Sequence, residues 1–217
     1  MDNLRETLRN AGVPPASTVP KERSGWRSRG YLPHFDAPGL VQHIVFRLAD
    51  SLPERFHDDI FKLHADERVP AIDVALDRGH GARALSDPRV AELVQGALLA
   101  FDATRYALLA WCVMPNHVYV LAAVKPECSL AGIIHSWKSY SAKRANRILG
   151  RTGAFWAKEY FDRFMRDDEH LATTAAYIEG NPVKAGLCQE VSDWRFSSAW
   201  HDWSGRDARG PHTAQPQ

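Results

Sequence analysis

The stretch that decides the fold reads Trp111-Cys-Val-Met-Pro-Asn-His117-Val-Tyr119-Val-Leu-Ala-Ala-Val124. Apolar runs at 106–113 and 118–124 flank a Met-Pro-Asn turn, which predicts two strands joined by a tight connection. Side chains alternate along a strand, so His117 and Tyr119 share one face while the valines occupy the other. The aliphatic face belongs to the core. The face that carries an imidazole and a phenol is therefore the candidate functional face.

Other elements follow outward from this pair of strands. The alternation over Leu40–Leu48 predicts a strand, and an aromatic-rich loop is expected over Phe155–Phe161. Capping and proline signals predict helices over about 53–66, 88–103, 129–149 and from Asp167 to the stop at Gly180-Asn181-Pro182. This order of elements predicts an α+β domain with an antiparallel sheet at its centre.

Length and composition suit one domain of ordinary size. The 217 residues are 45% hydrophobic, and 27 basic residues nearly balance 26 acidic ones, so net charge indicates no partner. We expect a basic, flexible arm over residues 1–35, a single domain over 36–203 and a disordered tail over 204–217. The three scattered cysteines favour reduced thiols, and no apolar run predicts a signal peptide or a membrane span.

A tyrosine lies on the polar stripe of the helix that begins at Asp167. His170, Thr174, Tyr177 and Asn181 fall on this stripe by helical spacing. A tyrosine beside an amide oxygen can be a nucleophile next to a metal ligand, because a divalent cation neutralises the charge of a phosphoryl group under attack. From spacing alone, a partly buried tyrosine before a helix stop is the simpler interpretation, and a structural histidine is the simpler interpretation of His117.

The helix over 129–149, extended to Arg151, is basic and carries no acidic residue. Its cations are Lys138, Lys143, Arg144, Arg147 and Arg151, and Trp137 and Tyr140 are interleaved with them. Such a stripe suits a nucleic-acid backbone, and aromatic rings can stack on bases. Arg47, on the strand face of His43, and Lys184, after the tyrosine, are two further cations that we assign to DNA.

Several motifs, in this order, resemble those of the REP-associated tyrosine transposases, which belong to the single-tyrosine HUH, or IS200-like, transposases. They are Met114–Tyr119, Ser136–Tyr140, Phe155-Trp156, Tyr160–Arg163 and Tyr177–Leu187. The resemblance runs from about Gly30 to Trp200. It implies a ferredoxin-like antiparallel sheet with helices packed on one face and the active site on the other.

The resemblance also implies a chemistry. Members of this family cut single-stranded DNA beside hairpins of repeated extragenic palindromes and transfer the strand through a 5′-phosphotyrosine intermediate, assisted by Mg²⁺ or Mn²⁺. By position, Tyr177 is the nucleophile, His117 the first histidine of the pair and Asn181 a third metal ligand. We expect single-stranded or hairpin DNA as partner, no nucleotide or organic cofactor, no membrane, a monomer or homodimer, and a bacterial cytoplasmic location on nucleoid DNA.

Tyr119 departs from the family pattern, which has a second histidine there. A protonated phenol is a poor metal ligand, so Tyr119 is only a possible member of the metal site. Three interpretations stay open at this point: an enzyme with altered metal use, a hairpin-binding relative that no longer cuts, or replacement of the imidazole by a group such as His43. An interaction domain with a basic helix is the bland alternative.

Overall fold

The computed structural model describes residues 25–28, 33–36, 39–53, 56, 60, 62–63 and 65–200. Its centre is an antiparallel sheet of four strands in the order β4-β5-β3-β6. The strands are β3 (Val41–Leu48), β4 (Tyr106–Val113), β5 (His117–Val124) and β6 (Trp156–Phe164). This strand order, with two α-helices described between β3 and β4 and one between β5 and β6, is the ferredoxin-like arrangement that the family resemblance implied.

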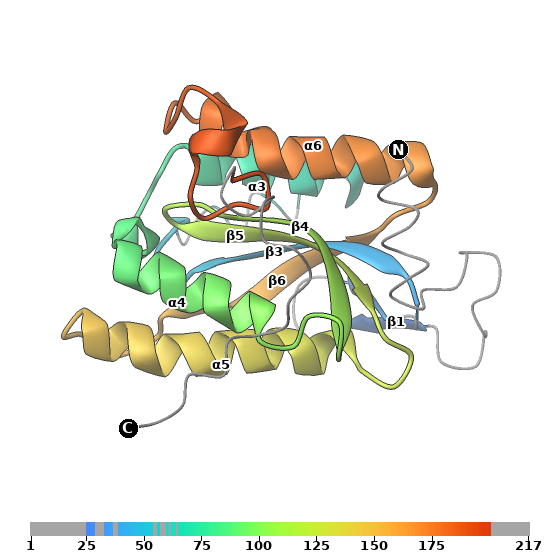
Figure 1. Ribbon diagram of the computed structural model, residues 1–217, viewed down its shortest axis with the longest axis horizontal. Coiled ribbons are helices and arrows are strands. Elements are labelled where there is room, and N and C mark those ends of the chain that lie inside the picture. The colour runs from blue at the N-terminus through green and yellow to red at the C-terminus, as the bar shows by residue number, and fades with distance from the viewer. Residues whose placement is uncertain are drawn as a thin grey trace.

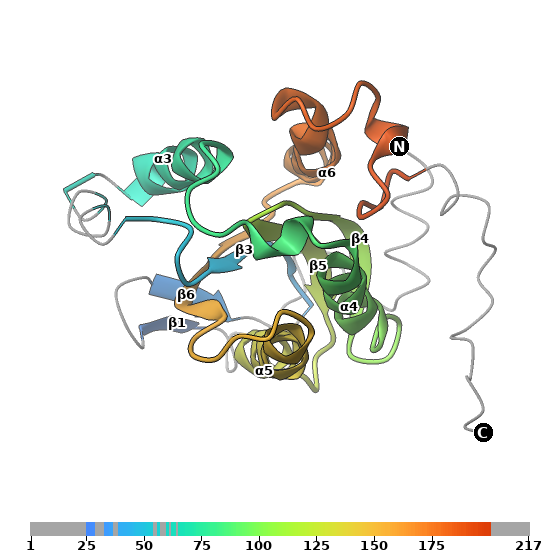
Figure 2. The same cartoon turned by 90° about the vertical axis from the view of Figure 1, so that its left-hand side faces the viewer.

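Helices cover both faces of the sheet (Figures 1 and 2). One face packs against α4 (Pro88–Leu99) and α5 (Leu130–Ile148). On the opposite face lie α3 (Ala65–Asp77) and α6 (Asp168–Lys184). The predicted fold class is confirmed, but the face reserved for the site is closed by two helices rather than left bare.

Side-chain caps explain where three of these helices begin. Asp87 accepts a hydrogen bond from the backbone N–H of Arg89, and Pro88 occupies the first turn of α4. Ser129 accepts from Gly132 at the start of α5, and Asp167 accepts from His170 at the start of α6. Each predicted start is confirmed.

The alternation along β5 divides the interior into two hydrophobic clusters. Val118, Val120 and their neighbours pack with α4 and α5 in the larger cluster. Tyr119 and Leu121 belong to the second cluster, which also contains apolar residues of α3 and α6. Every residue of β5 is buried, so the functional face predicted from the sequence lies inside the protein.

The predicted aromatic loop at 155–161 is wrong, because this segment forms the edge strand β6. Its backbone pairs with β3, with Val45 opposite Phe161 and Phe46 opposite Tyr160. The sequence WAKEYFDRF mixes aromatic and charged residues on both faces, so no clean period of two is visible. The strand is formed by backbone pairing with β3, which the local sequence pattern does not predict.

Two predicted helix boundaries also differ. Most of the expected helix at 53–66 lies outside the described residues, whereas α3 spans 65–77, a segment for which no helix was predicted. The predicted stop at Gly180-Asn181-Pro182 is wrong, because α6 continues through Pro182 to Lys184. Pro182 is buried, and packing of this turn against the protein outweighs the one helical hydrogen bond that proline cannot donate.

The ends of the chain are described only in part. Short strands β1 (Gly25–Ser28) and β2 (Pro33–Asp36) form an antiparallel pair near β6, so this part of the predicted arm has regular structure. Residues 1–24 of that arm and the predicted tail at 204–217 lie outside the described residues. No helix in the described ranges is long and apolar enough to cross a membrane.

Candidate active site

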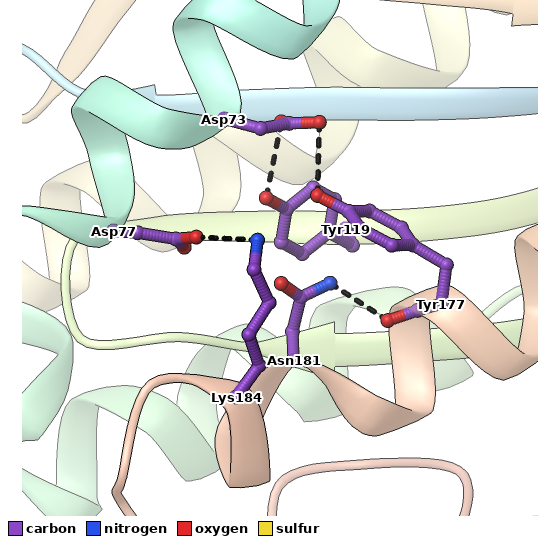
Figure 3. A network of polar contacts seen from close by, with 6 residues as sticks. All are labelled: Asp73, Asp77, Tyr119, Tyr177, Asn181 and Lys184. Carbon is purple, nitrogen blue, oxygen red and sulfur yellow. Dashed lines mark hydrogen bonds and ion pairs between the residues drawn. The ribbon is translucent and has the colours of Figure 1, made fainter.

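Two tyrosines from different elements meet at one carboxylate. The Tyr119 hydroxyl donates to Asp73 Oδ1 at 3.0 Å, and the Tyr177 hydroxyl donates to Asp73 Oδ2 at 3.0 Å. Figure 3 shows both phenols directed at Asp73, with Tyr177 reaching it from α6 and Asp73 from α3. The predicted nucleophile and the residue that departs from the family pattern therefore share one partner.

Asp73 joins this cluster in the structure, and the sequence did not predict it. Its side chain is buried, at 7% exposure, and burial raises its pKa to about 6 although the two tyrosine hydrogen bonds favour the carboxylate. The sequence holds one indication of this burial: the helical spacing of Ile72, Ala75 and Leu76 predicts a helix whose apolar face is buried next to Asp73. An acidic residue inside such a stripe needs a partner, but the chain pattern does not say which one.

Tyr177 is half-buried and neutral. Burial, followed by the negative charge of Asp73, raises the pKa of Tyr177 well above its ordinary value. Its ring meets the Tyr119 ring edge-on at 5.9 Å, and the ammonium of Lys184 lies 5.6 Å from the Tyr177 ring centre. Lys184 also forms an ion pair with Asp77 at 2.8 Å. Lys184, which we predicted to contact DNA, therefore lies beside Tyr177, and its ammonium is paired with the Asp77 carboxylate.

His117 presents a lone pair that has no partner in the described part of the chain. Its Nδ1 lies 2.7 Å from Asn116 Oδ1, while the Asn116 amide nitrogen donates to the carbonyl of Leu76. Because the Asn116 oxygen can only accept, His117 carries its proton on Nδ1, and Nε2 is left as the acceptor. Burial lowers the pKa of His117 to about 3, so the ring is neutral.

Asn181 offers a second acceptor of this kind. Its amide nitrogen donates to the Tyr177 carbonyl at 2.8 Å, and its Oδ1 has no hydrogen-bond partner among the described residues. The residue is 1% exposed, and Figure 3 shows its side chain extending from α6 toward Tyr119. Buried polar atoms without a partner carry an energetic cost, and His43 Nε2, next to Tyr119, is another such atom on this side of the sheet.

The donor set suits a cation that keeps much of its own hydration. No three His, Cys, Asp or Glu side chains gather into a metal site anywhere in the described ranges. One imidazole nitrogen and one amide oxygen are nevertheless compatible with Mg²⁺ or Mn²⁺, since Mg²⁺ retains waters and takes other ligands from substrate phosphates. His117 and Asn181 therefore carry donor atoms of the type that the expected ion takes.

Tyr119 does not complete this set. Its hydroxyl is given to Asp73, and burial raises the pKa of Tyr119 far above its ordinary value, so it stays a neutral donor. The suggestion that Tyr119 ligates the metal is wrong for this geometry. The His43 ring stacks on Tyr119 at 5.8 Å, and the His117 ring packs against the edge of Tyr119 at 4.7 Å. The Tyr119 ring therefore contacts both imidazoles.

A small pocket opens beside His117. Its volume is about 130 Å³, and Asp77, Arg78, Arg83 and the end of α6 contribute to its walls. Both arginines are exposed and bring positive charge to the edge of the site. An anionic chain that reaches His117 would pass these guanidinium groups.

The predicted DNA-binding residues divide into buried and exposed groups. Trp137 is 2% exposed, stacks on Phe46 and donates to the Tyr106 hydroxyl, so its assignment to base stacking is wrong. Arg47 is buried at 4% exposure and donates to the Leu48 carbonyl, which removes it from the surface. Lys138 donates to two carbonyls of β6, and burial lowers its pKa to about 8.

The remaining basic residues lie on the outside of α5 and just beyond its end. Lys143, Arg144 and Arg147 are exposed. Tyr140 is 46% exposed, with the Arg144 guanidinium 3.8 Å above its ring, and Arg151 donates to the Ala154 carbonyl. Figure 2 shows α5 and α6 on opposite faces of the sheet. The basic surface of α5 and the tyrosine of α6 are therefore carried by helices on different faces.

Part of the chain is similar in sequence to known transposases. The model of the family described as "Transposase IS200 like" matches residues 86–181. The chain is 27% identical over 107 residues to the putative REP-associated tyrosine transposase of Haemophilus influenzae, which covers 45% of this chain and 61% of that protein. It is 27% identical over 97 residues to the REP-associated tyrosine transposase of Escherichia coli K12, which covers 45% of this chain and 56% of that protein.

A solved structure extends the likeness to the fold. The REP-associated tyrosine transposase bound to a REP hairpin superposes with a TM-score of 0.51 over 79% of this chain and 81% of that one, at 18% identity. The sequence match spans only about three fifths of the curated relatives, and α3, which carries Asp73, precedes the family match. Residues 86–181 therefore match the IS200-like transposases, and the chain is similar in sequence to REP-associated tyrosine transposases and shares the fold of one of them.

Proposed function

We propose that this protein binds hairpin-forming single-stranded DNA and cleaves and transfers the strand through a covalent bond to Tyr177. The observation that carries the proposal is the placement of the Tyr177 hydroxyl on Asp73, on the sheet face that also holds the unpaired acceptors of His117 and Asn181. Tyrosine attack on phosphorus needs an oriented phenol and a means of stabilising phosphoryl charge. Asp73 orients the phenol, and His117 with Asn181 could bind a cation that stabilises the phosphoryl charge.

The chain's own residues account for positioning. Tyr177 is held at its hydroxyl by Asp73 and at its ring by Tyr119, so the phenol oxygen has little freedom. The oxygen attacks the scissile phosphorus, the bond to the 3′ oxygen breaks, and a 5′-phosphotyrosine and a free 3′ hydroxyl result. The covalent bond stores the energy for rejoining, so the proposed reaction requires no nucleotide cofactor.

His117 Nε2 and Asn181 Oδ1 are the atoms that would hold the expected Mg²⁺ or Mn²⁺. Bound there, the ion would act as a Lewis acid toward a phosphoryl oxygen of the DNA. The hydrogen bond from His117 Nδ1 to Asn116 fixes the ring tautomer that leaves Nε2 available, as a second partner commonly does for a ligating histidine.

DNA contact is proposed at two places. Arg78 and Arg83 flank the pocket beside His117, and Lys143 with Arg147 form the exposed basic surface of α5. A hairpin that touched both would have to wrap around an edge of the sheet. Phosphate contacts of this kind make binding sensitive to salt.

The proposal is tested by incubating the protein with a labelled hairpin DNA and Mn²⁺ and resolving the products under denaturing conditions. A covalent protein–DNA adduct is expected in the wild type and absent in Tyr177→Phe. A matched control is Tyr140→Phe, which removes an exposed hydroxyl on the opposite side of the sheet. Loss of the adduct in both variants, or in neither, would reject Tyr177 as the nucleophile.

A hairpin-binding protein without cleavage is the second candidate, and the geometry of Tyr119 favours it specifically. The family's second imidazole is absent, and the oxygen in its place is bound to Asp73. This function predicts salt-sensitive hairpin binding that Lys143→Ala with Arg147→Ala weakens, and that Tyr177→Phe and chelation of metal leave unchanged. Hairpin binding without any adduct would select it over cleavage.

A further inference from the structure

We propose that Asp73 is a catalytic residue of this site: it accepts the proton of the Tyr177 hydroxyl during strand cleavage, and Tyr119 is the positioning residue that holds it in place. The inference rests on the proposed function and adds a proton acceptor to it. Asp73 lies on α3, which precedes the segment that matches the family. Tyr119 is the residue that departs from the family pattern.

Each of the two Asp73 carboxylate oxygens accepts a hydrogen bond from a different tyrosine, and we assign a different role to each oxygen. Oδ2 receives the hydroxyl of Tyr177 at 3.0 Å, which is the distance at which a base can take a proton. Oδ1 receives the hydroxyl of Tyr119 at 3.0 Å. Since Tyr119 is completely buried and rigidly packed, its hydrogen bond fixes the carboxylate rather than competing for the reacting oxygen.

A base is useful here because the nucleophile is a poor one as it stands. Tyr177 is neutral, and attack by a phenol leaves a proton that must go to an acceptor. In the proposed step the bond from Tyr177 Oη to phosphorus forms, the proton moves from Oη to Asp73 Oδ2, and the bond from phosphorus to the 3′ oxygen breaks. The departing 3′ oxygen takes a proton from water, and Asp73 returns its proton to solvent or to Tyr177 on rejoining.

The charges around Asp73 allow it to serve near neutral pH. Asp77 on the same helix opposes its ionisation, Lys184 on α6 favours it, and the tyrosines of β5 and α6 stabilise the ionised form by hydrogen bonding. With its pKa raised to about 6, Asp73 is ionised at pH 7 and is a stronger base than an exposed aspartate.

Asp73→Asn removes the acceptor and preserves the size of the side chain. A positioned base contributes roughly 100-fold to 10,000-fold, so we expect adduct formation at least about 100-fold slower in single-turnover assays, with hairpin affinity unchanged. Glu92→Gln is the matched control, because it neutralises an exposed acid on α4, on the other face of the sheet, and the rate should stay at the wild-type value. Wild-type rates in Asp73→Asn would overturn the proposal.

The pH dependence of the cleavage rate distinguishes Asp73 as a base from Asp73 as a residue that only holds the structure in place. Wild-type cleavage should rise with pH through a midpoint near the Asp73 pKa of about 6, and this midpoint should vanish in Asp73→Asn. Tyr119→Phe, which keeps the ring and loses one hydrogen bond, should slow cleavage about tenfold and keep a midpoint. An unaltered profile in Asp73→Asn would reject Asp73 as the base, even if the rate fell.

One further readout does not depend on cleavage. Carbon NMR of the Asp73 carboxyl in the DNA-free protein should show its pKa rising in Tyr177→Phe and again in Tyr119→Phe, because each loses a hydrogen bond that favours the carboxylate. If the wild type forms no adduct, the proposed function fails, whereas an unchanged Asp73 pKa in both variants would overturn the contact itself. Asp73 is resolved from other acids by comparison with Asp73→Asn.

Discussion

Two imidazoles that are buried in the described part of the chain make the stability of this protein depend on pH. His43 is 8% exposed and His117 is 1% exposed. Burial, assisted by the positive charges of Arg163 and His170, lowers the pKa of His43 to about 4, and burial lowers that of His117 to about 3. A group whose folded pKa is depressed stabilises the fold above its unfolded pKa, and this contribution is lost as pH falls toward the folded value.

The size of the change in the free energy of unfolding follows from these pKa values and from that of Asp73, which acts in the opposite direction. Between pH 6.5 and pH 5, each histidine costs about 2 kcal/mol, because the unfolded chain binds a proton that the folded chain refuses. Asp73 acts in the other direction: its pKa is raised, so protonation below pH 6 returns about 1 kcal/mol. We expect a net loss of about 3 kcal/mol between pH 7 and pH 5.

Urea denaturation at pH 7 and pH 5 measures this loss directly, by comparing the free energies of unfolding. His43→Gln should reduce the loss by about 2 kcal/mol, and Asp73→Asn should increase it by about 1 kcal/mol, since the opposing group is gone. His135→Gln, which alters an exposed imidazole on α5, is the control and should keep the wild-type difference. Equal losses in wild type and His43→Gln would refute the reasoning.

Three further predictions concern the surface, the metal and the core. Lys143→Ala with Arg147→Ala should weaken hairpin binding and lower the slope of log affinity against log salt by about 1 to 2, measured by fluorescence anisotropy; an unchanged slope would contradict contact there. Tyr119→His should raise Mn²⁺ affinity by roughly tenfold or more in calorimetry, because it adds an imidazole two residues from His117; no change would show that this position does not face the ion. Trp137→Ala should cost about 3 to 5 kcal/mol of unfolding free energy in urea, whereas a cost below about 1 kcal/mol would contradict its place in the core.

The sequence was sufficient for the parts of the fold that local patterns encode. The strands at 106–113 and 118–124 and the capped starts at Asp87, Ser129 and Asp167 were predicted within a residue or two, because alternation and capping act over a few positions. Edge strand β6 escaped, since its pairing with β3 joins segments more than a hundred residues apart.

The site was predictable only where a motif carried it. Tyr177, His117 and Asn181 were chosen by resemblance, and the structure places them on the α6 side of the sheet. Asp73 was not visible, because its two hydrogen bonds span 46 and 104 residues and depend on tertiary packing. Trp137 was misassigned for a related reason: helical spacing shows that residues share a stripe, but burial decides whether the stripe meets solvent.

The proposed reaction requires a covalent bond between Tyr177 and DNA. The most direct measurement is mass spectrometry of peptides from protein incubated with a hairpin DNA and Mn²⁺, after nuclease trimming of the bound strand. We expect a nucleotide phosphate attached to the peptide that contains Tyr177, and none in Tyr177→Phe. A nucleotide attached to any other residue, or a wild-type protein that binds the hairpin and stays unmodified, would contradict it.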